Sequence, residues 1–184
     1  REVGIELYQQ MLEAAVAEAK ATDSEASPDN DQWTPQIDVG LPVLIPSNYV
    51  LDLGVRLALY RRIAVLADRS EIERFAAEMF DRFGPLPVEV ENLFCTVSLK
   101  QQCHSAGIEK LEAGPKGAMI SFRNNEFNNP LGLVEFITTQ SGTAKLRPDH
   151  KLVFNRDWNE KADRLSGVQY LIQQLVILAT TSEI

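Results

Sequence analysis

The sequence has only two cysteines and two histidines among its 184 residues. Cys95 and Cys103 fall in a stretch that predicts one helix, about 12 Å apart along its axis, which is beyond the reach of a disulfide. Two thiols cannot make up a structural zinc site, and His104 and His150 have no partner at ligand spacing. We therefore expect reduced thiols, no metal site and a cytoplasmic protein.

Long apolar runs are also missing. No segment approaches the roughly 20 apolar residues of a transmembrane helix, and no stretch has the pattern of a signal peptide. We predict no membrane partner. Because the chain starts without Met and enters a helical pattern at once, we expect it to be a piece of a longer protein.

Catalytic motifs are the third absence. The segment Gly114-Pro115-Lys116-Gly117 lacks the spacing of a phosphate-binding loop and is typical of a hairpin turn between two strands. No serine occupies a nucleophile elbow, and neither thiol has an evident base. The many carboxylates come with no pocket that the sequence can identify. We expect this chain to be non-catalytic and to bind no cofactor.

Basic residues are outnumbered, since 26 acidic and 18 basic side chains give a net charge of −8. Such a field repels nucleic acid overall, although a local basic patch can still bind phosphates. Arg56, Arg61 and Arg62 form the candidate patch. Two interpretations remain open: a DNA-binding surface, or a solvated face paired with nearby carboxylates.

What the sequence does contain is a pair of adjacent helices. Apolar spacing predicts one over residues 51–67 and a second that begins near Ser70, where Ser70 and Glu73 fit a capping box. The second should end before Gly84 and Pro85, because glycine accepts a left-handed conformation and proline cannot continue a helix. Its apolar face consists of Ile72, Phe75, Ala76, Met79 and Phe83.

The rest of the chain predicts helices that alternate with short strands. A helical pattern at 1–20 is followed by a polar, acidic linker at 21–35. The expected elements after it are an extended edge segment at 36–43, helices at 88–105, from 129 and at 157–180, and strands at 108–112, 118–122, 145–147 and 151–154. We therefore predict an α+β domain over residues 36–184, with a small, mostly antiparallel sheet packed against several helices.

Two carboxylates of the second helix occupy an unusual position. Glu78 and Asp81 are neighbours on the helix surface and point away from the apolar face. Asp81 falls in the last turn, where the helix dipole disfavours an anion. One explanation is that Arg74 and Arg82, each four residues from Glu78, neutralise the pair in place. The other is a contact outside the domain.

Two long sequence motifs resemble those of a known family. They are D-x-x-x-R-L-x-x-Y-R-R-I-A at residues 52–64 and E-x-x-D-R-F-G-x-L-P at residues 78–87, and shorter matches follow at 99–102, 107–112 and 116–117. From about residue 36 the chain resembles the C-terminal domain of bacterial transcription-repair coupling factors. Residues 1–20 resemble the end of the translocase module in that family.

The resemblance implies a non-catalytic regulatory domain in transcription-coupled DNA repair. Such a domain would dock on the N-terminal UvrB-like module of its own chain, mask the UvrA-binding surface and restrain the DNA translocase until stalled RNA polymerase is engaged. The interdomain interface would then include Glu78, Asp81, Arg82 and Arg74, with the two carboxylates accepting arginine forks.

ATP, Mg and DNA would be bound by the full-length protein rather than by this piece of it. An accessory DNA-binding domain that uses the helix of Arg56, Arg61 and Arg62 is the alternative.

Overall fold

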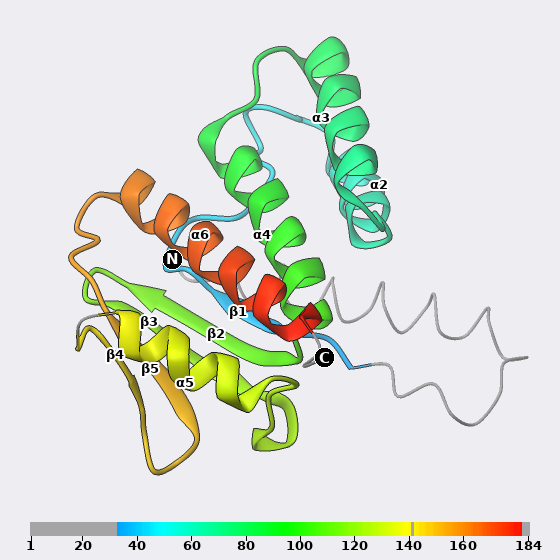
Figure 1. Ribbon diagram of the computed structural model, residues 1–184. Helices are drawn as coiled ribbons and strands as arrows, with labels where there is room; N and C mark the ends of the chain where they lie inside the picture. The colour runs from blue at the N-terminus through cyan, green and yellow to red at the C-terminus, as the bar shows by residue number, and fades with distance from the viewer. Residues whose placement is uncertain (1–32, 141, 182–184) are drawn as a thin grey trace, which may run out of the picture. The chain divides into compact units, whose positions relative to one another are not determined.

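The computed structural model describes residues 33–140 and 142–181 (Figure 1). The predicted helix at 1–20 and most of the predicted linker lie outside these residues. The described chain separates into two compact units. The first contains Trp33 and residues 42–98, and the second contains residues 34–41, 99–140 and 142–181.

The first unit is helical. It contains α2 (Leu53–Ala64), α3 (Arg69–Phe83) and the first part of α4 (Val88–Ser105). These helices confirm the predicted pair and the long helix after it, although Leu53 is 56% exposed and lies outside the core. The buried core consists of Ile45, Val50, Leu59, Ile63, Ile72, Phe75, Met79, Val90, Leu93 and Phe94.

The start of α3 corrects the sequence prediction. The N-cap is Asp68, whose Oδ1 accepts a hydrogen bond from the Glu71 amide at 2.8 Å. The Glu71 carboxylate in turn accepts from the Ala67 amide at 2.7 Å. The reciprocal pair thus lies two residues before the predicted Ser70 and Glu73, because the Asp68 carboxylate satisfies the orphan amide of Glu71.

The end of α3 agrees with the prediction. Gly84 follows the last helical residue with φ +88° and donates its amide to Phe80 O at 2.9 Å. The Tyr49 hydroxyl, from the segment before α2, hydrogen-bonds Met79 O at 3.2 Å and Gly84 O at 2.9 Å. Three carbonyls at this end of the helix, those of Met79, Phe80 and Gly84, are therefore bonded within the first unit.

The second unit contains a five-stranded sheet in the order β1-β2-β3-β5-β4. Only the β1–β2 pair is parallel, and the other three pairs are antiparallel, which confirms the predicted α+β class with a mostly antiparallel sheet. β1 is an edge strand as predicted, although it is shorter than 36–43. The strands are β1 Gln36–Asp38, β2 Ile108–Gly114, β3 Gly117–Phe122, β4 Ala144–Leu146 and β5 Lys151–Asn155.

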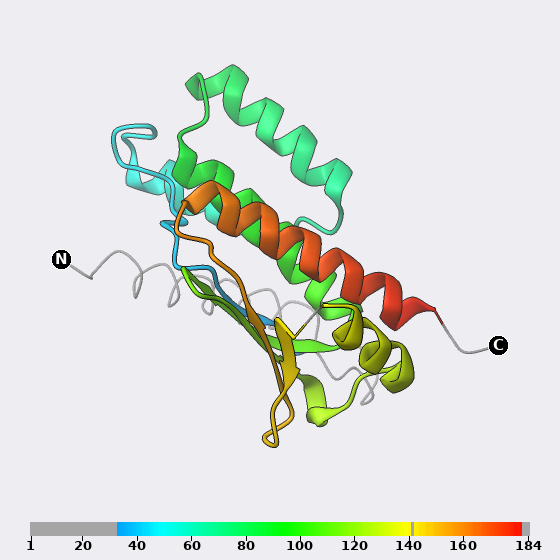
Figure 2. The same ribbon diagram turned by 60° about the vertical axis from the view of Figure 1, so that its left-hand side comes forward.

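The strands bury one face by alternation. Leu111 pairs with Ile120, and Ile120 pairs with Leu152, so a buried row crosses the three central strands. In Figures 1 and 2, α5 (Pro130–Thr139) and α6 (Lys161–Thr180) cover the same face of this sheet. The second part of α4 contributes Leu99 and Cys103 to this core, and Ala106 joins it just after the helix ends. A short 3₁₀ helix, η1 (Arg123–Asn125), follows β3.

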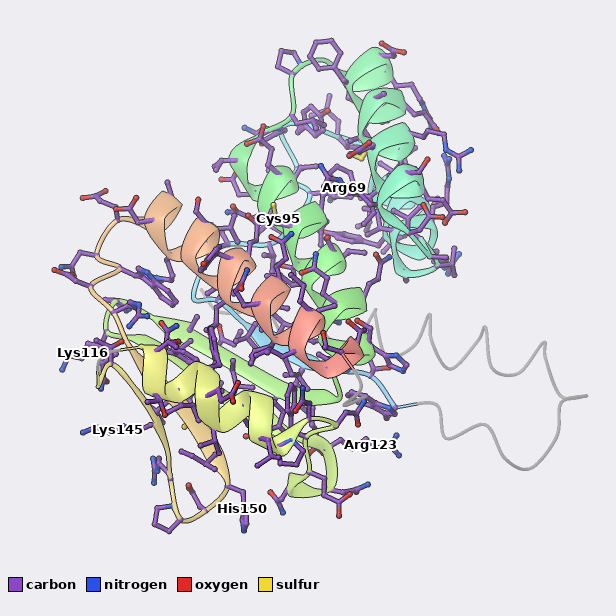
Figure 3. The ribbon with its side chains drawn as sticks, in the orientation of Figure 1. Arg69, Cys95, Lys116, Arg123, Lys145 and His150 are labelled. Atoms are coloured by element: carbon purple, nitrogen blue, oxygen red, sulfur yellow. The ribbon has the colours of Figure 1, made fainter. Side chains whose placement is uncertain are left out.

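The predicted hairpin between β2 and β3 is confirmed. Lys116 lies in its turn (labelled in Figure 3), and Gly114 pairs with Gly117 across it. Gly117 has φ +128°, and a Cβ atom there would lie 1.8 Å from Phe154 O on the neighbouring strand. Only glycine fits, because both the backbone conformation and the close approach exclude a side chain.

The start of α6 differs from its prediction. α6 begins at Lys161 rather than near Asp157, because the Trp158 amide donates to Pro115 O at 2.8 Å and its indole lies against Gly167. In α5, Val134 is 56% exposed and lies outside the core. Among the residues with described structure, no helix combines the length and the apolar character needed to cross a membrane.

Candidate interaction face on helix α3

The predicted interface residues lie on one helix, α3, whose start is marked by Arg69 in Figure 3. Its inner side is formed by Ile72, Phe75 and Met79, which are buried in the core of the first unit. Its outer side includes exposed Arg74, Phe80 and Asp81. The packing of α3 therefore fixes which side chains can meet a partner.

Glu78 is bonded by two arginines. Its two carboxylate oxygens accept from the two terminal nitrogens of Arg62 at 2.6 Å each, and Oε1 also accepts from Arg82 at 3.1 Å. The Arg62 hydrogen bond, followed by that of Arg82, lowers the pKa of Glu78 to about 2. The Arg62 guanidinium also lies 4.5 Å from the centroid of the Phe75 ring. Glu78 thus joins α3 to α2.

Asp81 has a different environment. It is exposed, lies in the last turn of α3, and forms no ion pair with any residue of 33–140 or 142–181. Its neighbour Phe80 is 53% exposed. Arg82 is directed elsewhere, since it bonds Glu78 and lies 5.0 Å from the Phe83 ring. The last turns of α3 therefore expose an apolar ring and an acid at consecutive positions.

Of the two arginines predicted to neutralise Glu78, only Arg82 does so. The Arg74 Nε donates to Ser70 O at 3.4 Å. The partner that sequence reasoning missed is Arg62, sixteen residues before Glu78. Helical spacing reveals only pairs on the same helix, so a pair between α2 and α3 requires the turn at 65–68 to be known.

The candidate basic patch is dispersed. Arg56 donates to Val50 O at 2.6 Å and to Leu51 O at 3.1 Å, which fixes the segment before α2. Arg62 is held by Glu78. Arg61 is exposed and forms no ion pair within the described ranges. The structure therefore leaves one of the three guanidinium groups for an outside phosphate.

The thiols and imidazoles do not gather into a site. Cys95 and Cys103 are not joined in a disulfide, and burial raises the pKa of the buried Cys103 thiol to about 12. His150 lies in the turn between β4 and β5 (Figure 3), far along the chain from His104 in α4. In the described part of the chain, no three metal-binding side chains come together.

Comparisons with known proteins agree on one family. The model of the TRCF domain matches residues 39–133. The transcription-repair-coupling factor of Rickettsia conorii is 43% identical over 155 residues, covering 84% of this chain and 13% of the relative. That of Escherichia coli K12 is 31% identical over 173 residues, covering 94% of this chain and 15% of the relative. This chain thus spans only about an eighth to a seventh of the length of these relatives.

A solved structure supports the fold. The crystal structure of the C-terminal domain of a transcription-repair coupling factor matches with a TM-score of 0.64 at 16% identity. The match covers 82% of this chain and 97% of the solved one. The family model covers more than half of the sequence, and the two sequence motifs at 52–64 and 78–87 lie within the matched range. The chain belongs to the TRCF-domain family of transcription-repair coupling factors.

Proposed function

We propose that this chain is the regulatory C-terminal domain of a transcription-repair coupling factor and acts as an intramolecular clasp. Docked on the N-terminal UvrB-like module, it masks the UvrA-binding surface and restrains the translocase. Engagement of stalled RNA polymerase shifts the docking equilibrium toward release. Membership of the family and the small share of the relatives' length that the chain spans support this role.

The proposal assigns no catalysis to this chain. ATP hydrolysis with Mg, DNA translocation and the recruitment of repair proteins belong to the full-length factor. A clasp needs a docking surface that binds moderately and can be released, and a small polar interface with an apolar centre meets that need better than a large apolar one.

The observation that carries the proposal is the exposed Asp81 at the C-terminal end of α3, which follows the exposed Phe80 in the sequence. An anion in the last turn is disfavoured by the helix dipole, and Asp81 has no ion pair among the described residues to offset this. An arginine of the partner would supply the missing ion pair, because a planar guanidinium can bond the Asp81 carboxylate and can stack on an aromatic ring such as that of Phe80. Glu78 is already bonded by Arg62 and Arg82 and acts as a positioning residue.

The DNA-binding alternative is less favoured. Two of its three arginines bond groups of this chain, and the net charge of −8 opposes nucleic acid. It predicts salt-dependent binding of duplex DNA that Arg61→Gln weakens.

Calorimetric titration against a purified N-terminal UvrB-like module of a transcription-repair coupling factor tests the clasp. We expect salt-sensitive binding that Asp81→Arg weakens at least about tenfold, because the variant sets like charges together. Glu109→Arg makes the same change of charge at an exposed position of β2 and should bind as the parent chain does. Binding in trans can be weak, since linkage in one chain supplies effective concentration.

Two outcomes would contradict the clasp. If Asp81→Arg binds as well as the parent chain, the interface lies on another face. If the parent chain shows no binding at about millimolar concentration, docking on this module is refuted.

A further inference from the structure

The turn that carries Phe80 and Asp81 is held by a side chain from another part of the first unit. The Tyr49 hydroxyl lies within hydrogen-bonding distance of Met79 O, at 3.2 Å, and of Gly84 O, at 2.9 Å. The first carbonyl comes immediately before the turn in the chain, and the second comes immediately after it. One hydroxyl therefore brackets the backbone that presents the exposed ring and the exposed acid.

Tyr49 is itself fixed in place. Its amide donates to Pro46 O at 3.1 Å. The next residue, Val50, is 3% exposed, and its carbonyl accepts from Arg56 of α2 at 2.6 Å. The Tyr49 ring meets the ring of Phe83 edge-on, with the two centroids 5.9 Å apart. Because ring and hydroxyl both contact the end of α3, the side chain cannot rotate away without losing both contacts.

The last turn of a helix frays readily, because its carbonyls have no partners within the helix. In α3 the Asp81 carboxylate adds to this tendency, since the helix dipole disfavours an anion at this end. A frayed turn would have to be ordered each time it docks, and that ordering lowers affinity. The Tyr49 hydroxyl can oppose fraying as a donor at neutral pH, because burial raises its pKa above the ordinary 10.

We propose that Tyr49 is a positioning residue for docking, whose hydroxyl holds the last turn of α3 in the conformation that presents Asp81 to the partner. The inference rests on the proposed clasp and adds to it a residue that lies 30 positions before Met79 in the chain. Tyr49 acts through the turn and does not itself touch the partner. It lies outside α3, so neither helical spacing nor the charge pattern of that helix identifies it.

Tyr49→Phe tests the proposal, because it removes the hydroxyl and keeps the ring that packs on Phe83. In carbon-13 NMR of the 184-residue chain, we expect the Cα shifts of residues 80–83 to move toward coil values while that of Phe75 stays unchanged. In calorimetric titration against the N-terminal UvrB-like module, docking should weaken about fivefold, the effect of about one net hydrogen bond. Tyr170→Phe makes the same change at an exposed position of α6 and should alter neither measurement.

A double-mutant cycle separates positioning from a general effect on stability. In the Asp81→Asn background, Tyr49→Phe should change docking by less than about twofold, because no carboxylate remains to be placed. An undiminished effect in this background would overturn the proposal, since Tyr49 would then act on the partner or on the fold as a whole.

Failure of this proposal is distinct from failure of the clasp. If Tyr49→Phe docks as the parent chain does while Asp81→Arg docks weakly, the clasp stands and the role of Tyr49 is refuted. Unchanged Cα shifts of residues 80–83 in Tyr49→Phe also refute that role, whatever the module binds. A parent chain that does not dock refutes the clasp, and the docking role of Tyr49 falls with it even if the shifts show that the hydroxyl orders the turn.

Discussion

At the scale of single residues, Glu78 of α3 holds α2 in place through its ion pair with Arg62. Its folded pKa of about 2 lies below the ordinary 4.5, so its ionised form stabilises the fold above about pH 4.5. That stabilisation is lost as the pH falls toward 2. We expect a carbon-13 NMR titration to place the Glu78 midpoint near 2, and Arg62→Gln to raise it toward 4.5. A parent-chain midpoint near 4.5 would show that the Arg62 fork does not persist in solution.

Gly117 gives a second residue-scale prediction. Its φ of +128°, together with the 1.8 Å that would separate a Cβ atom from Phe154 O, leaves no room for a side chain. Gly117→Ala should therefore lower the free energy of unfolding by at least about 3 kcal/mol in urea denaturation. Gly114, its partner in the same hairpin, has open space around it, so Gly114→Ala should change stability by less than about 0.5 kcal/mol. Equal effects of the two substitutions would contradict this account.

Arg164 shows what residue-by-residue reasoning missed. It is 7% exposed, and its terminal nitrogens lie 3.3 Å from Val39 O and Gly40 O and 3.5 Å from Trp158 O. A signal existed in the sequence, because position 164 is on the same helical stripe as Val168 and Leu171. A charged residue on an apolar stripe indicates buried partners. The local sequence does not identify the carbonyls that Arg164 bonds, because their position depends on where β1 lies in the sheet.

At the scale of elements, the cap of α3 can be tested directly. Asp68→Ala removes the acceptor of the Glu71 amide and should cost about 1 kcal/mol of stability. Ser70→Ala should fall within about 0.5 kcal/mol of the parent chain, because Ser70 lies inside the helix and is exposed. Chemical denaturation of both variants decides between the two N-caps. A larger loss for Ser70→Ala would restore the capping box predicted from sequence.

The elements were predicted well where local rules determine them and poorly where packing does. Glycine and proline marked the end of α3 at Gly84 correctly, and the segment Gly114-Pro115-Lys116-Gly117 gave the hairpin turn between β2 and β3. The prediction of the start of α6 was wrong because Trp158 is held by contacts with Pro115 and Gly167. Hydrophobic periodicity gives no sign of such contacts. At the candidate site, spacing found Arg82 for Glu78 but not Arg62, which arrives from another helix.

At the scale of the whole molecule, each unit has a buried core of its own, and α4 contributes residues to both. Met79 is fully buried in the first core and Leu152 in the second, so either alanine variant should lose about 2–5 kcal/mol of local stability. We predict that the losses stay separate, because no buried residue belongs to both clusters. In hydrogen exchange, Met79→Ala should speed the amides of α2 and α3 while β3 and β5 keep their protection, and Leu152→Ala should do the reverse. Uniform acceleration in either variant would instead mean that the chain unfolds as one cooperative body, with the continuous helix α4 coupling the two cores.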